Sequence, residues 1–297
     1  MTFLKRLFAP LAAILALGGT PVAATAASSA RPALWAVGDA DTTVYLFGTI
    51  HLLPQNYQWR SAKIDKAIEG SSELMVETIV DDKNPQKLMS AMASLAFSKG
   101  LPPITERVPA EKRPALEAAI AKSGVPRSVY DQMETWAVAF MLLGNQFRDM
   151  GLKGGEGVET VLRGAFTSEG KPIGELETNT EQLGFFDKLP EDAQRSLLEG
   201  AIDKPEAMSK EFDGMLASWV RGDVDGIADT FNRDLAASPE LRAALLKQRN
   251  ANWSRWIEQR MAQPGAIMIA VGAGHLAGKD SVIDMLEHDG YRVRRLQ

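Results

Sequence analysis

The sequence carries the same short pattern twice, once near its beginning and once near its end. In each copy an apolar segment, at 44–47 or at 266–271, runs into the motif Gly-x-x-His, which ends at His51 or at His275. A predicted helix and a further predicted strand follow each motif. A strand that leads through a helix into a second strand forms a βαβ unit with parallel strands and a right-handed crossover. Two such units constrain the fold strongly, because they can share one sheet.

The spacing of apolar residues predicts the remaining elements of both units. In the first unit we expect a helix over 57–69 and a strand over 74–79. In the second unit we expect a helix from about Asp280, which Gly290 ends, and a short strand over 291–294.

The middle of the sequence is mostly helical. Proline and glycine separate five predicted helices, at 85–99, 110–122, 129–150, 190–202 and 205–219. The segment 171–177 has room for a short strand, and Ser238-Pro239 begins a long helix before the last strands. We therefore predict an α/β fold, with a central mixed sheet built from the two βαβ units and a helical insertion or cap between them. No linker forces a boundary within 32–297, which we expect to be a single domain.

The first 27 residues have the pattern of a cleavable signal peptide. Lys5 and Arg6 precede an apolar run over 7–17, and small residues at 24–26 fit a cleavage site. The apolar run is shorter than a helix that spans a bilayer. We expect an exported protein, periplasmic or secreted, with no stable membrane insertion; the alternative is an uncleaved anchor.

Composition excludes several kinds of chemistry. The chain has no cysteine, so disulfides, cysteine-based zinc or iron–sulfur sites and a cysteine nucleophile are excluded. It has three histidines, and His288, near a predicted helix end, is expected to be structural. The net charge is -5 and no run of Lys or Arg exceeds a dipeptide, which argues against nucleic-acid binding. Gly-x-Ser-x-Gly, His-Glu-x-x-His and Walker A motifs are absent from the sequence.

The two Gly-x-x-His motifs predict a metal site. Parallel sheets bind ligands at the carboxyl ends of their strands, so His51 and His275 are expected to meet there. Glu77, at the end of the 74–79 strand, would reach the same edge. Two imidazoles and a carboxylate suit Zn²⁺, Mn²⁺, Fe²⁺ or Co²⁺, with open positions for water. The alternatives are hydrogen-bonded loop histidines and a solvated glutamate.

One arginine lies within an apolar stripe. Arg249 is four residues from both Leu245 and Trp253 on the predicted helix that follows Ser238. If it is buried, it needs a carboxylate or a ligand as partner. The alternative is an arginine at the edge of the stripe that extends to water.

Taken in order, these motifs resemble the TraB/GumN family, which is related to the Tiki metalloproteases. The matching segments are Tyr45–Pro54, Glu73–Glu77, Gly174–Thr178, Leu246–Asn250 and Val271–Gly278. The resemblance covers about 32–297 and implies an α/β fold shared with the erythromycin-esterase and haem-binding ChaN groups. It also implies that His51, Glu77 and His275 are metal ligands, and that Arg249 and Asn250 belong to the pocket.

The first hypothesis for function is a metal-dependent hydrolase with a peptidase-like reaction. A metal-bound water would attack a carbonyl of a peptide or small-molecule substrate. Glu177 is the candidate general base, although it could equally be a surface turn residue, and Arg249 would stabilise the oxyanion or hold a substrate carboxylate.

Two other classes of function stay open. ChaN-like relatives suggest a non-catalytic protein that binds haem or another tetrapyrrole through a histidine. A partner-binding or regulatory protein with a vestigial pocket is the third hypothesis, and the presence of all three implied ligands argues against it. The sequence does not determine the metal, the substrate or the oligomeric state.

Overall fold

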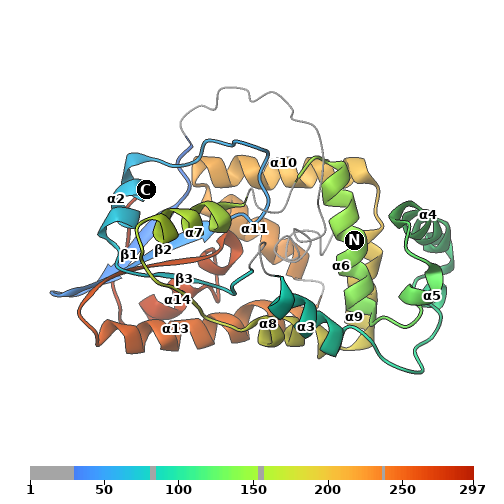
Figure 1. The fold of residues 1–297 in the computed structure, drawn as a ribbon. Coiled ribbons are helices and arrows are strands. Elements are labelled where there is room, and N and C mark those ends of the chain that lie inside the picture. Colours follow the sequence, from blue (N-terminus) through green and yellow to red (C-terminus); the bar gives the residue numbers. More distant parts are fainter. Residues whose placement is uncertain (1–29, 81–84, 153–156, 236–237) are drawn as a thin grey trace.

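The computed structural model describes residues 30–80, 85–152, 157–235 and 238–297 (Figure 1). The signal peptide expected over 1–27 lies outside these residues. Within them, six strands form one sheet in the order β4-β3-β5-β2-β1-β6. The strands are β1 (Leu34–Gly38), β2 (Thr42–Thr49), β3 (Leu74–Val76), β4 (Ile173–Glu175), β5 (Gly265–Gly272) and β6 (Val293–Arg295).

Helices make up most of the remaining chain. They are α2 (Ala62–Gly70), α3 (Gln86–Leu95), α4 (Arg113–Ser123), α5 (Arg127–Tyr130), α6 (Thr135–Asp149), α7 (Val158–Ser168), α8 (Asn179–Asp187), α9 (Glu191–Ala201), α10 (Pro205–Arg221), α11 (Val224–Leu235), α12 (Pro239–Arg242), α13 (Gln248–Met261) and α14 (Val282–His288). Short 3₁₀ turns are η2 (Ile104–Glu106), η3 (Ala110–Lys112) and η5 (Ala273–Leu276), and η4 (Ala243–Lys247) is a π-helical segment. In the part of the chain described, none of these helices combines the length and the apolar character needed to span a membrane.

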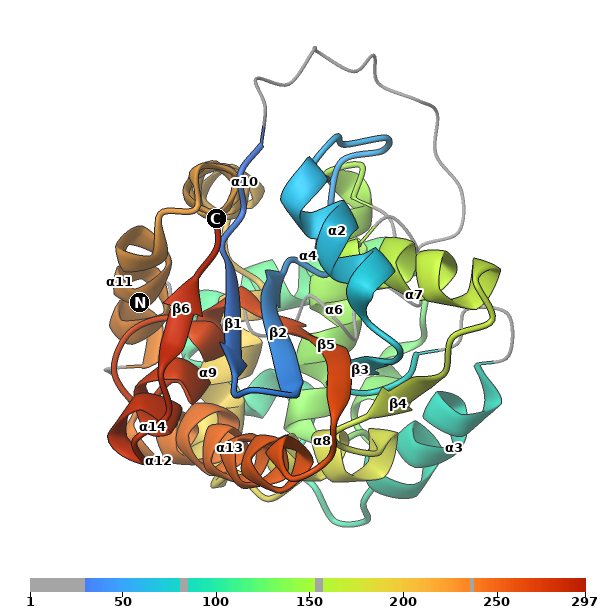
Figure 2. The same cartoon turned by 90° about the vertical axis from the view of Figure 1, so that its left-hand side faces the viewer.

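The sheet is mixed and joins the two ends of the chain, as the sequence predicts. Strands β2, β5, β3 and β4 are parallel, and β5 lies between β2 and β3 (Figure 2). Strand β1 pairs antiparallel with both β2 and β6. The N-terminal βαβ unit is therefore β2-α2-β3, and the C-terminal unit inserts its first strand into the middle of it. Strand β1 was not among the predicted elements.

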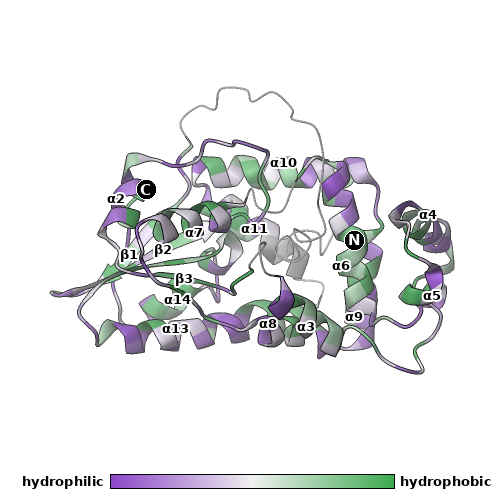
Figure 3. Cartoon of the chain, in the orientation of Figure 1, coloured by the Kyte–Doolittle hydropathy of each residue, from purple (hydrophilic) through white to green (hydrophobic). Residues whose placement is uncertain are grey.

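Helices cover both faces of the sheet, and the alternation of side chains along β2 shows why. Val44 and Leu46 pack in a cluster with residues of α13 and α14. Phe47, on the opposite face, belongs to the cluster that includes α2, α7 and the helical insertion. The central strands β2 and β5 are accordingly rich in apolar residues, whereas polar residues lie on exposed stretches of helices such as α4 (Figure 3).

Several boundaries differ from those predicted. Helix α2 begins at Ala62 rather than at residue 57, because the Ser61 side chain accepts a hydrogen bond from the Ile64 N–H and caps it. Strand β3 ends at Val76. The single helix expected over 129–150 is two helices, α5 and α6. Between them the buried Arg107 guanidinium donates to the carbonyls of residues 131 and 133, which a continuous helix would have used itself.

The first turn of α7 packs directly against the loop after β2. The Val158 N–H donates to the Ile50 carbonyl at 3.1 Å. Gly157 precedes Val158, and a Cβ at Gly157 would lie 2.0 Å from the His51 carbonyl oxygen. Glycine is therefore required here by close approach, and this contact fixes where His51 sits.

We predict that Gly157→Ala lowers the free energy of unfolding by about 1–3 kcal/mol, because the methyl group would force α7 away from His51. Gly164→Ala is the matched control, since a Cβ at Gly164, within α7, has no neighbour within 4 Å. It should be neutral or stabilise the helix by up to about 1 kcal/mol. Denaturant unfolding measures both, and equal effects of the two substitutions would contradict the packing argument.

Candidate functional site

The side chains expected to form a site come from the carboxyl ends of the parallel strands. His51 follows β2, and Glu77 follows β3 directly. Strand β5 ends at Gly272, and His275 lies in the η5 turn just after it. The structure therefore brings these three residues to one edge of the sheet, as the sequence predicts.

Three side chains lie close to the position that a Cβ at residue 272 would occupy. A Cβ added there would lie 3.1 Å from Glu77 Oε1, 3.5 Å from His51 Nε2 and 3.6 Å from His275 Cδ2. The Gly272 N–H also donates to Glu77 Oε1 at 2.6 Å. The space that a side chain would occupy at position 272 is therefore the point on which the two imidazoles and the carboxylate converge.

Glu77 and Glu177 are neighbours because strands β3 and β4 pair in register. The pairing continues past the strands, where the Glu177 N–H donates to the Glu77 carbonyl at 2.8 Å. Helix α8 begins immediately afterwards with a capping box between Thr178 and Glu181. This cap fixes the turn at Glu177, which is buried and not a surface turn residue.

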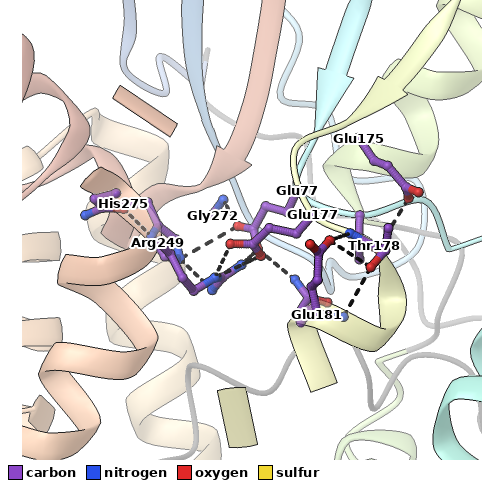
Figure 4. Close-up of polar contacts among 11 residues, drawn as sticks. Glu77, Glu175, Glu177, Thr178, Glu181, Arg249, Gly272 and His275 are labelled. Carbon is purple, nitrogen blue, oxygen red and sulfur yellow. Dashed lines mark hydrogen bonds and ion pairs between the residues drawn. The ribbon is translucent and has the colours of Figure 1, made fainter. Parts of the chain in front are cut away.

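Arg249 joins the two glutamates (Figure 4). Its Nη2 donates to Glu77 Oε2 at 2.7 Å and to Glu177 Oε2 at 2.8 Å. Its Nε donates to both oxygens of Glu177 at 3.0 Å. The guanidinium carbon lies 4.7 Å from the centre of the Trp253 ring, on the same helix. These contacts form a charge-assisted network of one cation and two carboxylates.

Burial decides between the two expectations for Arg249. Its side chain is 4% exposed, and those of both glutamates are 6% exposed. The arginine is therefore a buried residue with carboxylate partners and not one that extends to water. The long helix expected from Ser238 does begin there, but the π-helical segment η4 interrupts it just before Arg249. Such segments are frequent at functional sites.

The two carboxyl groups have different electrostatic surroundings. Burial raises the pKa of Glu77, but Arg249, His275, His51 and the Gly272 N–H outweigh it and hold that pKa well below its usual range. Burial dominates at Glu177 and raises its pKa, although Arg249 opposes the shift. Two carboxylates outweigh the effect of burial on Arg249 and raise its pKa. Glu77 is thus firmly anionic, and Glu177 is the carboxyl that binds a proton more readily.

Asn250 holds His275 in one orientation. The Asn250 amide nitrogen donates to the Asp280 carbonyl at 2.7 Å, so its Oδ1 faces His275 Nδ1 at 2.6 Å. Nδ1 then carries the proton, and Nε2 accepts from Arg249 Nη1 at 3.1 Å. Burial and the Arg249 charge lower the pKa of His275 to about 3. His275 is therefore neutral, with its lone pair on Nε2.

Glu159, which the sequence reasoning missed, holds His51. Its Oε1 lies 2.5 Å from His51 Nδ1 and also accepts from the Thr49 hydroxyl. Burial lowers the pKa of His51, but the adjacent Glu159 carboxylate outweighs it and raises that pKa overall. Glu159 lies in the first turn of α7, where acidic residues are common for helix-dipole reasons alone. Its position in the sequence therefore carried no signal of this role.

The side chains at this edge carry nitrogen and oxygen donors of the types that divalent transition metals bind. Both histidines are held through Nδ1, so Nε2 is the nitrogen of each ring that faces a possible ligand. A second partner on Nδ1 is typical of metal-binding histidines. Among the residues described, however, no three potential ligands lie close enough together to hold an ion as they stand. Nε2 of His275 is 3.9 Å from Glu77 Oε1 and is occupied by Arg249 Nη1. Binding at this nitrogen requires Arg249 to release that one contact.

Comparison with known proteins identifies the family. The model of the TraB/PrgY/gumN family matches residues 33–295. The chain belongs to this family. It is 25% identical over 246 residues to the uncharacterized protein YbaP of Escherichia coli K12, covering 82% of this chain and 87% of the relative. YbaP of Shigella flexneri matches equally. No solved structure matches the chain. The family resemblance seen in the sequence is confirmed.

We predict that Arg249→Met lowers the free energy of unfolding by about 3–5 kcal/mol, because it leaves two buried carboxylates without their cation. The matched control is Arg255→Met on the same helix, where the arginine is exposed and contacts Asn252. Its effect should stay within about 0.5 kcal/mol. Chemical denaturation of both variants measures the difference. Similar values would show that the buried network does not stabilise the fold.

Proposed function

We propose that this protein is a metal-dependent hydrolase with a peptidase-like reaction. The observation that carries the proposal is the convergence of His51 Nε2, Glu77 Oε1 and the His275 ring on the space beside Gly272. A buried arginine and a second buried carboxylate lie next to this space. A purely structural role does not account for two histidines, three carboxylates and an arginine gathered at the edge where parallel sheets bind ligands.

The atoms that would hold a divalent cation are His51 Nε2, Glu77 Oε1 and His275 Nε2. Zn²⁺, Mn²⁺, Co²⁺ and Fe²⁺ all accept such a set of nitrogen and oxygen ligands. When bound, the ion would supply Lewis acidity, which lowers the pKa of a coordinated water and polarises a carbonyl. Glu159 and Asn250 would keep both imidazoles oriented through their Nδ1 atoms.

Glu177 is the group proposed to carry the proton. Burial raises the pKa of its carboxyl, which suits a general base that must hold a proton briefly. The proton leaves the attacking water as its oxygen bonds to the carbonyl carbon, and it goes to the amine nitrogen when the C–N bond breaks. Glu177 then returns to the carboxylate form, paired with Arg249.

Arg249 is proposed to stabilise negative charge on the substrate. A guanidinium has five N–H donors. Four of them account for the contacts with Glu77, Glu177 and His275, and the fifth is on Nη1. This N–H, on the nitrogen that contacts His275 Nε2, would donate to the developing oxyanion or to a substrate carboxylate.

We predict that the purified protein carries a transition metal and cleaves members of a peptide library, and that His51→Ala and His275→Ala each lower the rate at least about 100-fold. The third histidine supplies a matched control, because His288 is exposed at the end of α14. His288→Ala should leave metal content and cleavage unchanged. Elemental analysis and mass spectrometry of the cleaved peptides measure both properties.

A metal-affinity measurement tests the roles of the flanking residues without using activity. Glu159→Leu and Asn250→Leu should each weaken metal binding by about 10–100-fold in competition with a chelator. Undiminished cleavage in both His→Ala variants would overturn the proposed mechanism. A shift of the haem absorption band on titration, without any cleavage, would favour the tetrapyrrole-binding alternative.

We also propose that the protein is exported, on the basis of the signal-peptide pattern over 1–27. N-terminal sequencing of the protein recovered outside the cytoplasm should give a chain that begins near residue 28. An intact Met1 on the exported protein would contradict cleavage.

A further inference from the structure

A hollow of about 850 Å³ lies at the β1–β6 side of the sheet and takes no part in the site described above. The chain entering β1, the start of α2, the end of α10 and the chain leaving β6 meet around it (Figure 2). Its lining residues include none of the side chains that surround Gly272. It is therefore a distinct feature of the molecule.

Cationic side chains dominate the lining of this hollow. Five of its lining residues are Arg31, Arg60, Lys63, Arg221 and Arg295, and its lining includes no acidic side chain. All five side chains are exposed. The whole chain has a net charge of -5, so a cluster of five positively charged side chains differs from the rest of the molecule. It creates a positive potential within a concave surface, which concentrates anions.

Nearby acidic side chains neutralise only part of this charge. Arg60 pairs with Asp65 at 2.6 Å, and Arg221 with Asp223 at 3.4 Å. Arg31, Lys63 and Arg295 have no carboxylate side chain within ion-pair distance in the described part of the chain. An excess of positive charge is left on this side of the hollow.

Two of these cations are held in place by backbone oxygens. Lys63 Nζ donates to the Leu296 carbonyl at 2.5 Å. Arg295 donates to backbone oxygens of Gly222 and Gln297 and lies over the Trp35 ring. These contacts orient the Lys63 ammonium and the Arg295 guanidinium. A ligand would therefore meet cations that are already partly ordered, which lowers the entropic cost of binding.

We propose that this hollow binds an anionic ligand that carries more than one phosphate-type group. Guanidinium groups bind phosphate oxygens through two parallel hydrogen bonds, and an ammonium adds a point charge. The volume exceeds that of a single phosphate, and cations line it from four separate segments, so a ligand with several charged groups makes the most contacts. Such groups occur in soluble polyphosphorylated compounds and in the headgroups of anionic phospholipids.

The test uses the full chain and inorganic tripolyphosphate as the probe. Titration calorimetry at low salt should detect binding that weakens as sodium chloride rises from about 0.02 M to about 0.3 M, because exposed charges are screened. The double variant Arg31→Gln/Lys63→Gln should bind at least tenfold more weakly. Flotation with vesicles then distinguishes the two sources of the phosphate group. Binding to phosphatidylglycerol vesicles but not to phosphatidylcholine vesicles indicates a lipid headgroup, whereas binding of tripolyphosphate alone indicates a soluble compound.

A charge-matched control separates the hollow from general electrostatics. Arg113→Gln/Lys210→Gln removes the same charge from exposed positions on α4 and on the first half of α10. This control should bind as the unmodified chain does. The proposal is overturned if neither probe binds, or if both double variants lose affinity equally. Circular dichroism of each variant establishes that it is folded, and the binding test does not depend on any hydrolytic activity.

Discussion

The ion network of Arg249 with Glu77 and Glu177 is the interaction on which the site depends. Without the guanidinium, two carboxylates would be buried within one cluster, at a cost that folding could not easily offset. With it, strands β3 and β4 can place both acids at adjacent ends. The same arginine reaches His275, so one side chain of α13 links the ends of strands β3, β4 and β5.

The two histidines occupy similar positions but have opposite electrostatic partners. Nδ1 of His51 contacts the carboxylate of Glu159, which favours the protonated ring. Nδ1 of His275 contacts the neutral amide of Asn250, and the nearby charge of Arg249 disfavours protonation of that ring. Two Gly-x-x-His motifs that look equivalent in the sequence therefore supply imidazoles of different basicity. The difference comes from α7 and α13, which lie outside both motifs.

The sequence was sufficient to predict the parts of the fold that depend on local patterns of residues. It was not sufficient where contacts between residues distant in the sequence determine an element boundary or the partner of a side chain. The continuous apolar run of β5 and the two histidine motifs were sufficient for the βαβ units and for the edge at which the side chains meet. The break between α5 and α6 depends on Arg107, which captures carbonyls from a segment remote in sequence. Glu159 was missed because an acid in a first helical turn is ordinary. These features become visible only when the contacts are known.

The insertion of β5 between β2 and β3 has a consequence for how the molecule is made. During synthesis both neighbouring strands emerge long before β5, so neither has this partner until residues 265–272 have been made. Pairing between such distant segments raises contact order and slows folding. It also means that no partly synthesised chain can bring the two imidazoles together.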